Sequence, residues 1–123
     1  MGVIRPSLNP AQPGAGVELC RMDEIEDPGS KGFDFREGDA WFGGFLVRVG
    51  ERVIGYVDSC PHAGWPLGSA PDQYLTRDKD RILCAGHGMA FAIDTGACVV
   101  GPESLCLTPW LVEVGMDGVV RTA

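Results

Sequence analysis

At 123 residues, the chain is long enough for one domain with a single hydrophobic core. Hydrophobic residues make up 45% of it and charged residues 22%, as in ordinary globular proteins, and the longest apolar runs are too short for a membrane-spanning helix. The formal net charge of −7 argues against nucleic acid as a partner. It is compatible with a basic protein partner and equally with simple solubility.

Residues 1–16 are interpreted as a flexible N-terminal arm. Three prolines and three glycines interrupt any periodic pattern there. The arm also lacks the basic stretch and following apolar stretch of a secretory signal, so we expect no export signal and a cytoplasmic location. Residues 17–123 are predicted to form the single folded domain.

The first predicted elements are short. Val17–Arg21 alternates between apolar and polar residues, which predicts a strand. Residues 23–26 fit one helical turn that ends at Pro28 and Gly29. Lys31–Gly38 is polar and rich in turn-forming residues, although Phe33 and Phe35 would share one face of a possible strand.

Three hairpins are predicted in the remainder of the chain. Gly44–Val49 and Arg52–Val57 flank a tight turn with glycine and form the first. A strand at Arg81–Cys84 precedes the second hairpin, Met89–Ile93 with 97–100, and residues 110–114 with 119–121 make the third. About eight short strands without a long helix predict an all-β barrel or sandwich.

The only two histidines of the chain each lie beside a cysteine. They occur in the stretches Cys60-Pro61-His62 and Cys84-Ala85-Gly86-His87. Two thiolates and two imidazoles can hold an iron–sulfur cluster or a structural zinc ion. The single residue between Cys60 and His62 is a shorter spacer than zinc sites generally have, so zinc is the less favoured alternative.

These stretches resemble the ligand loops of the Rieske iron–sulfur family. Residues 60–67 resemble the first loop, residues 84–91 the second, and Gly101-Pro102 the proline loop beyond them. The resemblance extends weakly from about residue 17 to residue 120. It implies an all-β fold of stacked antiparallel sheets with a small cluster-binding subdomain, which we place at about residues 58–102.

The resemblance also implies a cofactor and its ligands. The cofactor would be a Rieske-type 2Fe–2S cluster, with Cys60 and Cys84 on one iron and His62 and His87 on the other. Two imidazoles in place of two thiolates make the site less negative by two charges. This difference raises the reduction potential above that of four-cysteine ferredoxins.

Departures from the respiratory members of the family indicate a subtype. Those members have a disulfide between the loops, but Trp65 and Gly86 stand at the matching positions here. They also place two hydroxyls near the cluster sulfurs, where this chain has Met89 and Phe91. The pattern is similar to Rieske ferredoxins and oxygenase-associated domains and predicts a low potential.

The predicted function is that of a one-electron carrier and not of an enzyme on its own, since no catalytic constellation accompanies the ligand pairs. A ferredoxin would take electrons from a reductase and deliver them to an oxygenase or a related oxidoreductase. The alternatives are a small Rieske subunit of a larger oxidoreductase, such as nitrite reductase, and a zinc-binding interaction module without redox activity.

Two further features bear on partners and compartment. The segment between His62 and Cys84 is long and mixed in charge, which fits a solvated hairpin or an edge for partner recognition. An apolar rim of Trp65, Pro66, Leu67 and Pro102 would suit transient docking, although core packing of Trp65 is as plausible. The odd number of cysteines indicates a reducing compartment, and Cys98 and Cys106 are predicted to be buried thiols.

Overall fold

The structure is a computed structural model that describes residues 10–60, 66–68, 72–84, 88–102 and 104–123. The described residues form nine strands and one short 3-10 helix, so the predicted all-β fold is confirmed. The elements, in chain order, are β1 (Glu18–Arg21), η1 (Met22–Glu24), β2 (Gly29–Glu37), β3 (Ala40–Val49), β4 (Arg52–Val57), β5 (Arg81–Cys84), β6 (Met89–Ala92), β7 (Cys98–Val100), β8 (Val112–Val114) and β9 (Val119–Thr122).

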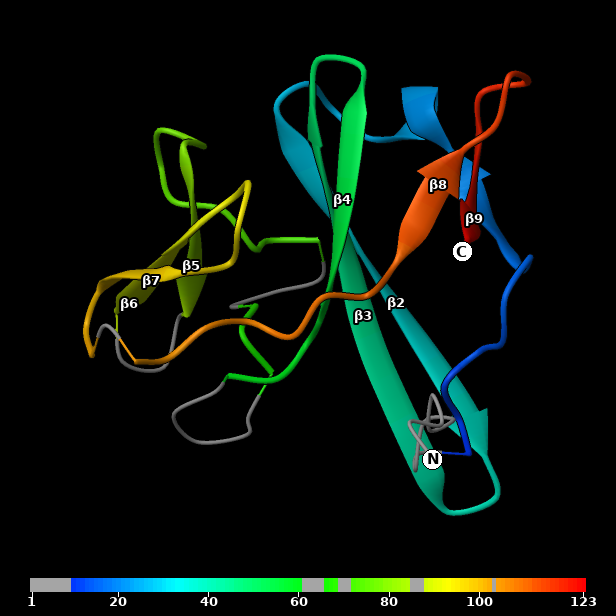
Figure 1. Ribbon diagram of the computed structural model, residues 1–123, viewed down its shortest axis with the longest axis horizontal. Helices are drawn as coiled ribbons and strands as arrows, with labels where there is room; N and C mark the ends of the chain where they lie inside the picture. The colour runs from blue at the N-terminus through cyan, green and yellow to red at the C-terminus, as the bar shows by residue number, and fades with distance from the viewer. Residues whose placement is uncertain (1–9, 61–65, 69–71, 85–87, 103) are drawn as a thin grey trace, which may run out of the picture.

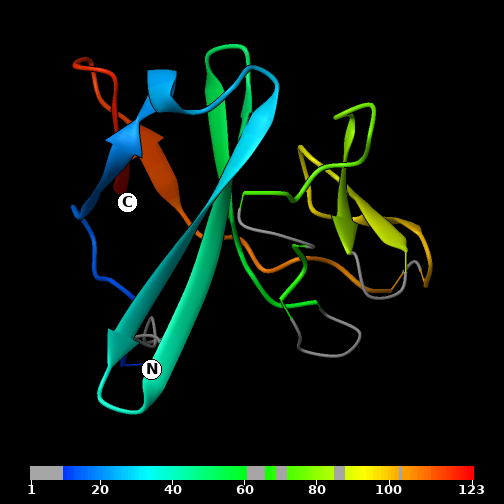
Figure 2. The same cartoon turned by 180° about the vertical axis from the view of Figure 1, so that it is seen from behind.

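The strands pair into three antiparallel sheets of three strands each, in the orders β1-β9-β8, β2-β3-β4 and β5-β6-β7. The long β2-β3 hairpin crosses the middle of the molecule (Figure 1). The sheet of β5, β6 and β7 lies on one side of it, and β1, β8 and β9 lie on the other, as the view from behind also shows (Figure 2). Within the described ranges, no helix is both long and apolar enough to cross a membrane.

The β2 strand is longer than the sequence suggested. It runs over nine residues and pairs with β3 along its whole length. Phe33 and Phe35 lie on its inner face, with ring centroids 6.2 and 6.1 Å from that of Trp110. Asp34 between them points to the other face, which is solvated, and a strand with one solvated side resembles a loop in composition.

The central sheet separates two hydrophobic cores because successive side chains of a strand point to opposite faces. Phe45 and Val47 of β3 face the first core, and Phe42 and Leu46 face the second. We name the first the ligand-side core; its buried residues are Phe45, Val47, Tyr56, Cys60, Leu67, Tyr74, Ile82, Cys84, Met89, Phe91, Ile93, Cys98 and Leu107. We name the second the tryptophan core; its buried residues are Ala11, Cys20, Ile25, Phe42, Leu46, Trp110 and Val120.

The described end of the predicted N-terminal arm is attached to β9. The buried Thr122 hydroxyl accepts a hydrogen bond from the Val17 backbone N–H at 2.8 Å and donates one to the Gly14 carbonyl at 2.6 Å. The Gly16 N–H also donates to the Thr122 carbonyl. These bonds hold residues 14–17 against the tryptophan core, while residues 1–9 lie outside the described part of the chain.

Candidate metal centre

Cys60 lies two residues beyond Asp58, at the point where β4 passes into the first predicted ligand loop. Its side chain is 1% exposed and belongs to the ligand-side core. The main chain before it is fixed, because the Asp58 N–H donates to the Gly43 carbonyl of β3 at 2.8 Å. The paired strands β3 and β4 therefore determine where this thiol is placed.

Cys84 is the last residue of β5 and is 2% exposed. It pairs with Met89, the first residue of β6. The Gly88 N–H donates to the Cys84 carbonyl at 2.9 Å. Gly88 has a φ of +72°, a conformation that glycine adopts without steric cost.

The two histidines of the predicted ligand set, His62 and His87, lie outside the described residues. The described residues alone contain no group of three or more potential ligand side chains. They do bring Cys60 and Cys84 into one buried cluster, and neither forms a disulfide. Two buried thiols that are not consumed by a disulfide fit the cysteine half of a mixed cysteine and histidine site.

Asp58 is a buried carboxylate beside the first ligand pair, and the sequence reasoning did not single it out. Its Oδ1 accepts a hydrogen bond from the Leu67 N–H at 2.7 Å, and its Oδ2 accepts one from the Tyr74 hydroxyl at 3.2 Å. Burial raises the pKa of Asp58, and these two hydrogen bonds oppose that rise. The only local signal in the sequence is an acidic residue at the end of an apolar strand.

The segment before β5 forms a hairpin, as one of the two interpretations proposed. Leu75 pairs with Ile82, and the Thr76 N–H donates to the Arg81 carbonyl at 2.9 Å. The turn includes Lys79, whose φ is +58°. Burial, followed by the nearby Asp58 charge, raises the pKa of Tyr74 at the start of this hairpin.

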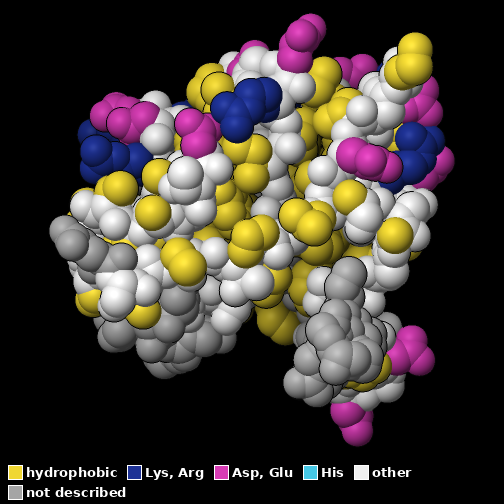
Figure 3. Space-filling model, viewed as in Figure 1, with side chains coloured by type: hydrophobic (Ala, Val, Ile, Leu, Met, Phe, Trp, Pro, Cys, Tyr) yellow, Lys and Arg dark blue, Asp and Glu magenta, His cyan; other side chains and the backbone are white. Residues whose placement is uncertain are grey.

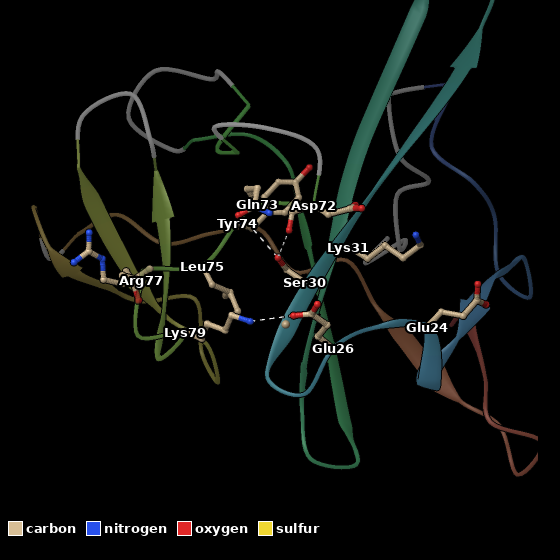
Figure 4. Close-up of a pocket in the computed structure, with 12 residues that line it drawn as sticks. Glu24, Glu26, Ser30, Lys31, Asp72, Gln73, Tyr74, Leu75, Arg77 and Lys79 are labelled. Carbon is tan, nitrogen blue, oxygen red and sulfur yellow. Dashed lines mark hydrogen bonds and ion pairs between the residues drawn. The ribbon is translucent and has the colours of Figure 1, made fainter.

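This hairpin is attached to β2 across a polar groove of about 460 Å³ (Figure 4). The Ser30 hydroxyl donates to the Asp72 carbonyl at 2.8 Å, and Asp72 Oδ1 accepts from the Gly32 N–H at 2.8 Å. Lys79 Nζ lies 3.0 Å from the Glu26 carboxylate on the opposite wall. The long segment therefore packs on the central sheet.

Met89 and Phe91 are both buried in the ligand-side core. Neither carries a hydroxyl, which is the sequence feature behind the expected low potential, and that potential stays a prediction. Gly101, before Pro102, has a φ of +128°, and a Cβ at this position would lie 3.1 Å from Cys98 Sγ and 3.2 Å from Met89 Cγ. The proline loop thus approaches the ligand-side core closely only because residue 101 is glycine.

The predictions for the remaining thiols and for the apolar rim need two corrections. Cys98 is buried as expected, but Cys106 is exposed. Cys106 pairs with Ala97 in an extended segment, so it points away from the core that Leu107 enters. Leu67 is fully buried and cannot belong to an exposed rim, whereas Pro66 and Pro102 are exposed and Trp65 lies outside the described residues.

Acidic and basic side chains form ion pairs on the surface of the protein. On the face in Figure 3, charged side chains gather toward the upper margin, and hydrophobic side chains lie across the middle, where the segment between β7 and β8 runs. Arg52 and Asp94 form an ion pair of 3.2 Å, and Arg121 contacts both Glu18 and Asp117. Basic side chains therefore lie among the acidic ones on the surface and pair with some of them.

Comparison with known families gives one match over most of the chain. A family model described as "Rieske [2Fe-2S] domain" matches residues 16–111. The matched range includes both cysteine and histidine pairs. No match to the chain was found among curated proteins.

Solved structures have the same fold. A chain of the complex of reduced oxygenase and oxidized ferredoxin in carbazole 1,9a-dioxygenase is 27% identical, with a TM-score of 0.67 over 87% of this chain and 100% of that one. The ferredoxin of carbazole 1,9a-dioxygenase from Nocardioides aromaticivorans IC177 is 22% identical, with a TM-score of 0.66 over 88% and 98%. A putative NADH-dependent nitrite reductase small subunit from Mycobacterium tuberculosis is 18% identical, with a TM-score of 0.61 over 86% and 91%.

Proposed function

The chain belongs to the Rieske [2Fe-2S] domain family, and from this premise we propose that its two cysteine and histidine pairs are the ligands of the cluster. Cys60 and Cys84 bind one iron. His62 and His87 bind the other. The observation that supports the cysteine half most directly is the burial of Cys60 and Cys84 in one core without a disulfide, with Cys84 at the end of β5 and Cys60 three residues beyond β4.

The protein is an electron-transfer component that holds a 2Fe–2S cluster. When bound, the cluster supplies one-electron oxidation and reduction. The two thiols are shielded from water, since Cys60 and Cys84 are 1% and 2% exposed in the core that also contains Leu67 and Phe91. A dry, apolar surrounding of this kind is one of the means by which proteins tune a cluster potential.

A ferredoxin that delivers electrons to an oxygenase is the favoured role. The supporting likeness is the 27% identity to a full chain of a complex between an oxygenase and a ferredoxin. The nitrite reductase small subunit is similar at 18% identity, which indicates a common fold but does not extend to a common partner. Co-purification separates the two roles, since a subunit is recovered with a large chain and a free carrier is not.

A cytoplasmic location is proposed because the cysteines form no disulfides. None of the five cysteines forms a disulfide, and four of them are buried. Proteins of oxidising compartments generally pair their cysteines in disulfides. Alkylation of unfolded protein taken directly from cells tests this proposal: five modified thiols are expected, and fewer would indicate an oxidising compartment.

The ligand assignment is tested by metal content and by substitution. Purified protein is expected to contain about two irons and two sulfides per chain. Replacing either histidine, in His62→Ala or His87→Ala, is expected to remove the cluster or most of it. One zinc per chain without iron would contradict the redox role and favour the zinc-binding alternative. A normal Rieske paramagnetic spectrum with a low average g value in His87→Ala would contradict the ligand set.

The reduction potential is expected near the low end of the Rieske range, about −150 mV. Met89 lies opposite Cys84 in the strand register and offers no hydroxyl. The Met89→Ser variant is expected to have a higher potential, because a hydrogen bond to a cluster sulfur favours the more negative reduced state. Voltammetry of both proteins measures the difference. A wild-type midpoint well above zero would place the protein with the respiratory subtype.

A further inference from the structure

The Asp58 side chain closes the loop that contains the first ligand pair. Asp58 lies at the start of this loop and Leu67 at its end, and a hydrogen bond of 2.7 Å joins the Asp58 carboxylate to the Leu67 N–H. Leu67 is fully buried, so its N–H has little access to water as an alternative partner. A buried N–H without a partner is costly, and this bond therefore fixes the separation of the two loop ends.

Tyr74 forms a hydrogen bond to the second oxygen of the Asp58 carboxylate. Its hydroxyl donates to Asp58 Oδ2 at 3.2 Å, and both side chains are buried, with exposures of 7% and 6%. The Tyr74 ring stacks on Phe45 with a centroid separation of 4.3 Å and an interplanar angle of 3°. Its hydroxyl lies against Gly32, where a Cβ would collide with it. The position of the hydroxyl is thus determined by the central sheet.

Tyr74 also leads to the second ligand pair. Its carbonyl accepts a hydrogen bond of 2.9 Å from the N–H of Leu83, the residue before Cys84. Three bonds therefore join Leu67 to Asp58, Asp58 to Tyr74, and Tyr74 to Leu83. Figure 4 shows Tyr74 beside Ser30 of β2, at the edge where the inter-ligand segment meets the central sheet.

We propose that Asp58 and Tyr74 are positioning residues of the cluster site, which fix the two ligand loops relative to each other through this hydrogen-bonded path. The inference rests on the proposed function, because it assumes that the loops hold the cluster ligands. It also assigns a role to the long segment between His62 and Cys84: this segment supplies the tyrosine. Neither residue touches the iron in this proposal, and both act through the backbone of the loops.

The test compares two tyrosine variants. Tyr74→Phe keeps the ring stack on Phe45 and removes the hydroxyl that reaches Asp58. Tyr56→Phe is the matched control, since Tyr56 is equally buried, also packs against Phe45, and donates at 2.6 Å to the carbonyl of Ile93, which lies in neither ligand loop. The measurements are the rate of iron loss to a chelator and the g values of the reduced cluster.

Tyr74→Phe is expected to lose iron about tenfold faster than the wild type, which corresponds to about 1.4 kcal/mol, the worth of one buried hydrogen bond. Its g values are expected to shift or broaden. Tyr56→Phe is expected to keep the wild-type rate within about threefold and the wild-type spectrum, although it loses a similar bond. Equal rates and spectra in the two variants would overturn the inference.

Substitutions of Asp58 give a second readout. Asp58→Asn can still accept from the Leu67 N–H and can donate to the Tyr74 oxygen, so near wild-type rates and g values are expected. Asp58→Ala leaves both partners unsatisfied and is expected to lose iron about a hundredfold faster. An Asn variant as fast as the Ala variant would contradict positioning by hydrogen bonds. Absence of iron and sulfide from the wild type would instead overturn the proposed function.

Discussion

The tryptophan core is packed around one large ring, whereas the ligand-side core contains cysteine thiols and adjoins a buried carboxylate. On the tryptophan side, the ring of Trp110 lies 5.4 Å from that of Phe42 and contacts two further rings of β2. The outer sheet on the tryptophan side has strands of three or four residues, and so has the outer sheet on the ligand side. Hydrogen bonds of Tyr56, Asp58 and Tyr74 supplement packing there.

The difference indicates how the two halves depend on their surroundings. In the tryptophan core, three rings surround Trp110 and provide apolar packing. The ligand-side core includes the thiols of Cys60, Cys84 and Cys98 and adjoins the buried Asp58 carboxylate, which are polar or reactive groups at positions where apolar side chains would pack better. We infer that the first core provides stability and that the second gives up stability to hold the site.

The largest effect is expected from Trp110→Ala. Removing a buried Trp side chain costs about 3–5 kcal/mol, and Trp110 contacts three other rings of the tryptophan core. Both the circular dichroism of the backbone and the colour of the cluster should be lost at lower denaturant concentration. The control is Leu111→Ala, which alters a neighbour that is 70% exposed and should change the unfolding free energy by less than about 0.5 kcal/mol. Similar denaturant unfolding curves for Trp110→Ala and Leu111→Ala would refute the proposal that the tryptophan core provides most of the stability.

A smaller and more local effect is expected from Gly101→Ala. The φ of +128° disfavours alanine, and the new methyl group would press on Cys98 and Met89, at a cost of about 1–3 kcal/mol. Loss of cluster colour on heating should move to lower temperature by more than the loss of backbone structure. Gly50→Ala is the control: its φ is +62°, but its Cβ would meet open space. Equal shifts of both signals in Gly101→Ala would mean that the two cores unfold together.

The two ion pairs between the halves of the molecule are expected to contribute less. Arg52 contacts Asp94 and Lys79 contacts Glu26, but all four side chains are substantially exposed. The double variant Arg52→Gln, Lys79→Gln should lower the unfolding free energy by about 0.4–2 kcal/mol at low salt and by nothing measurable in 1 M salt. Arg77→Gln, which removes an exposed charge from the same hairpin, serves as control. If the loss of unfolding free energy persists in 1 M salt, it arises from the packing of the two side chains and not from their charges.

The smallest effect concerns the pH dependence of the β8-β9 hairpin. Arg121 contacts both oxygens of Asp117, and this contact, aided by the Val119 N–H, lowers the pKa of Asp117 from 3.8 to about 2. Because the folded pKa is the lower one, the stabilisation is present above about pH 4 and is lost as the pH falls toward 2. The stability difference between wild type and Asp117→Asn should therefore shrink from pH 5 to pH 3. A constant difference would contradict the lowered pKa.

Much of the fold could be predicted because it depends on local patterns. The hairpins at residues 44–57, 89–100 and 110–121 follow from alternating residues and glycine turns, and the structure confirms them. The extent of β2 was not predicted, because one of its faces is solvated and its polar residues resemble those of a loop. Phe33 and Phe35, two residues apart, were the available signal.

The candidate site was harder to predict from the sequence than the fold. The ligand pairs could be recognised because their chemistry is unusual and their spacing is short. Asp58 and Tyr74 could not be connected, since 16 residues separate them and their contact depends on how the inter-ligand segment packs on β2. Cys106 was placed wrongly because its apolar neighbours do not reveal which side of an extended segment faces the core.

The packing of Trp110 against the central sheet has a genetic consequence. A Cβ at Gly44 would collide with the Trp110 ring, and a Cβ at Gly55 would collide with the Trp110 carbonyl. The ring and Gly44 are therefore complementary, and neither can change freely alone. Trp110→Leu should act as a second-site suppressor of Gly44→Ala, because the smaller side chain vacates the space that the methyl group needs. Trp110→Leu should not suppress Gly55→Ala. The methyl group at residue 55 would collide with the backbone carbonyl of residue 110, which is present whatever the side chain.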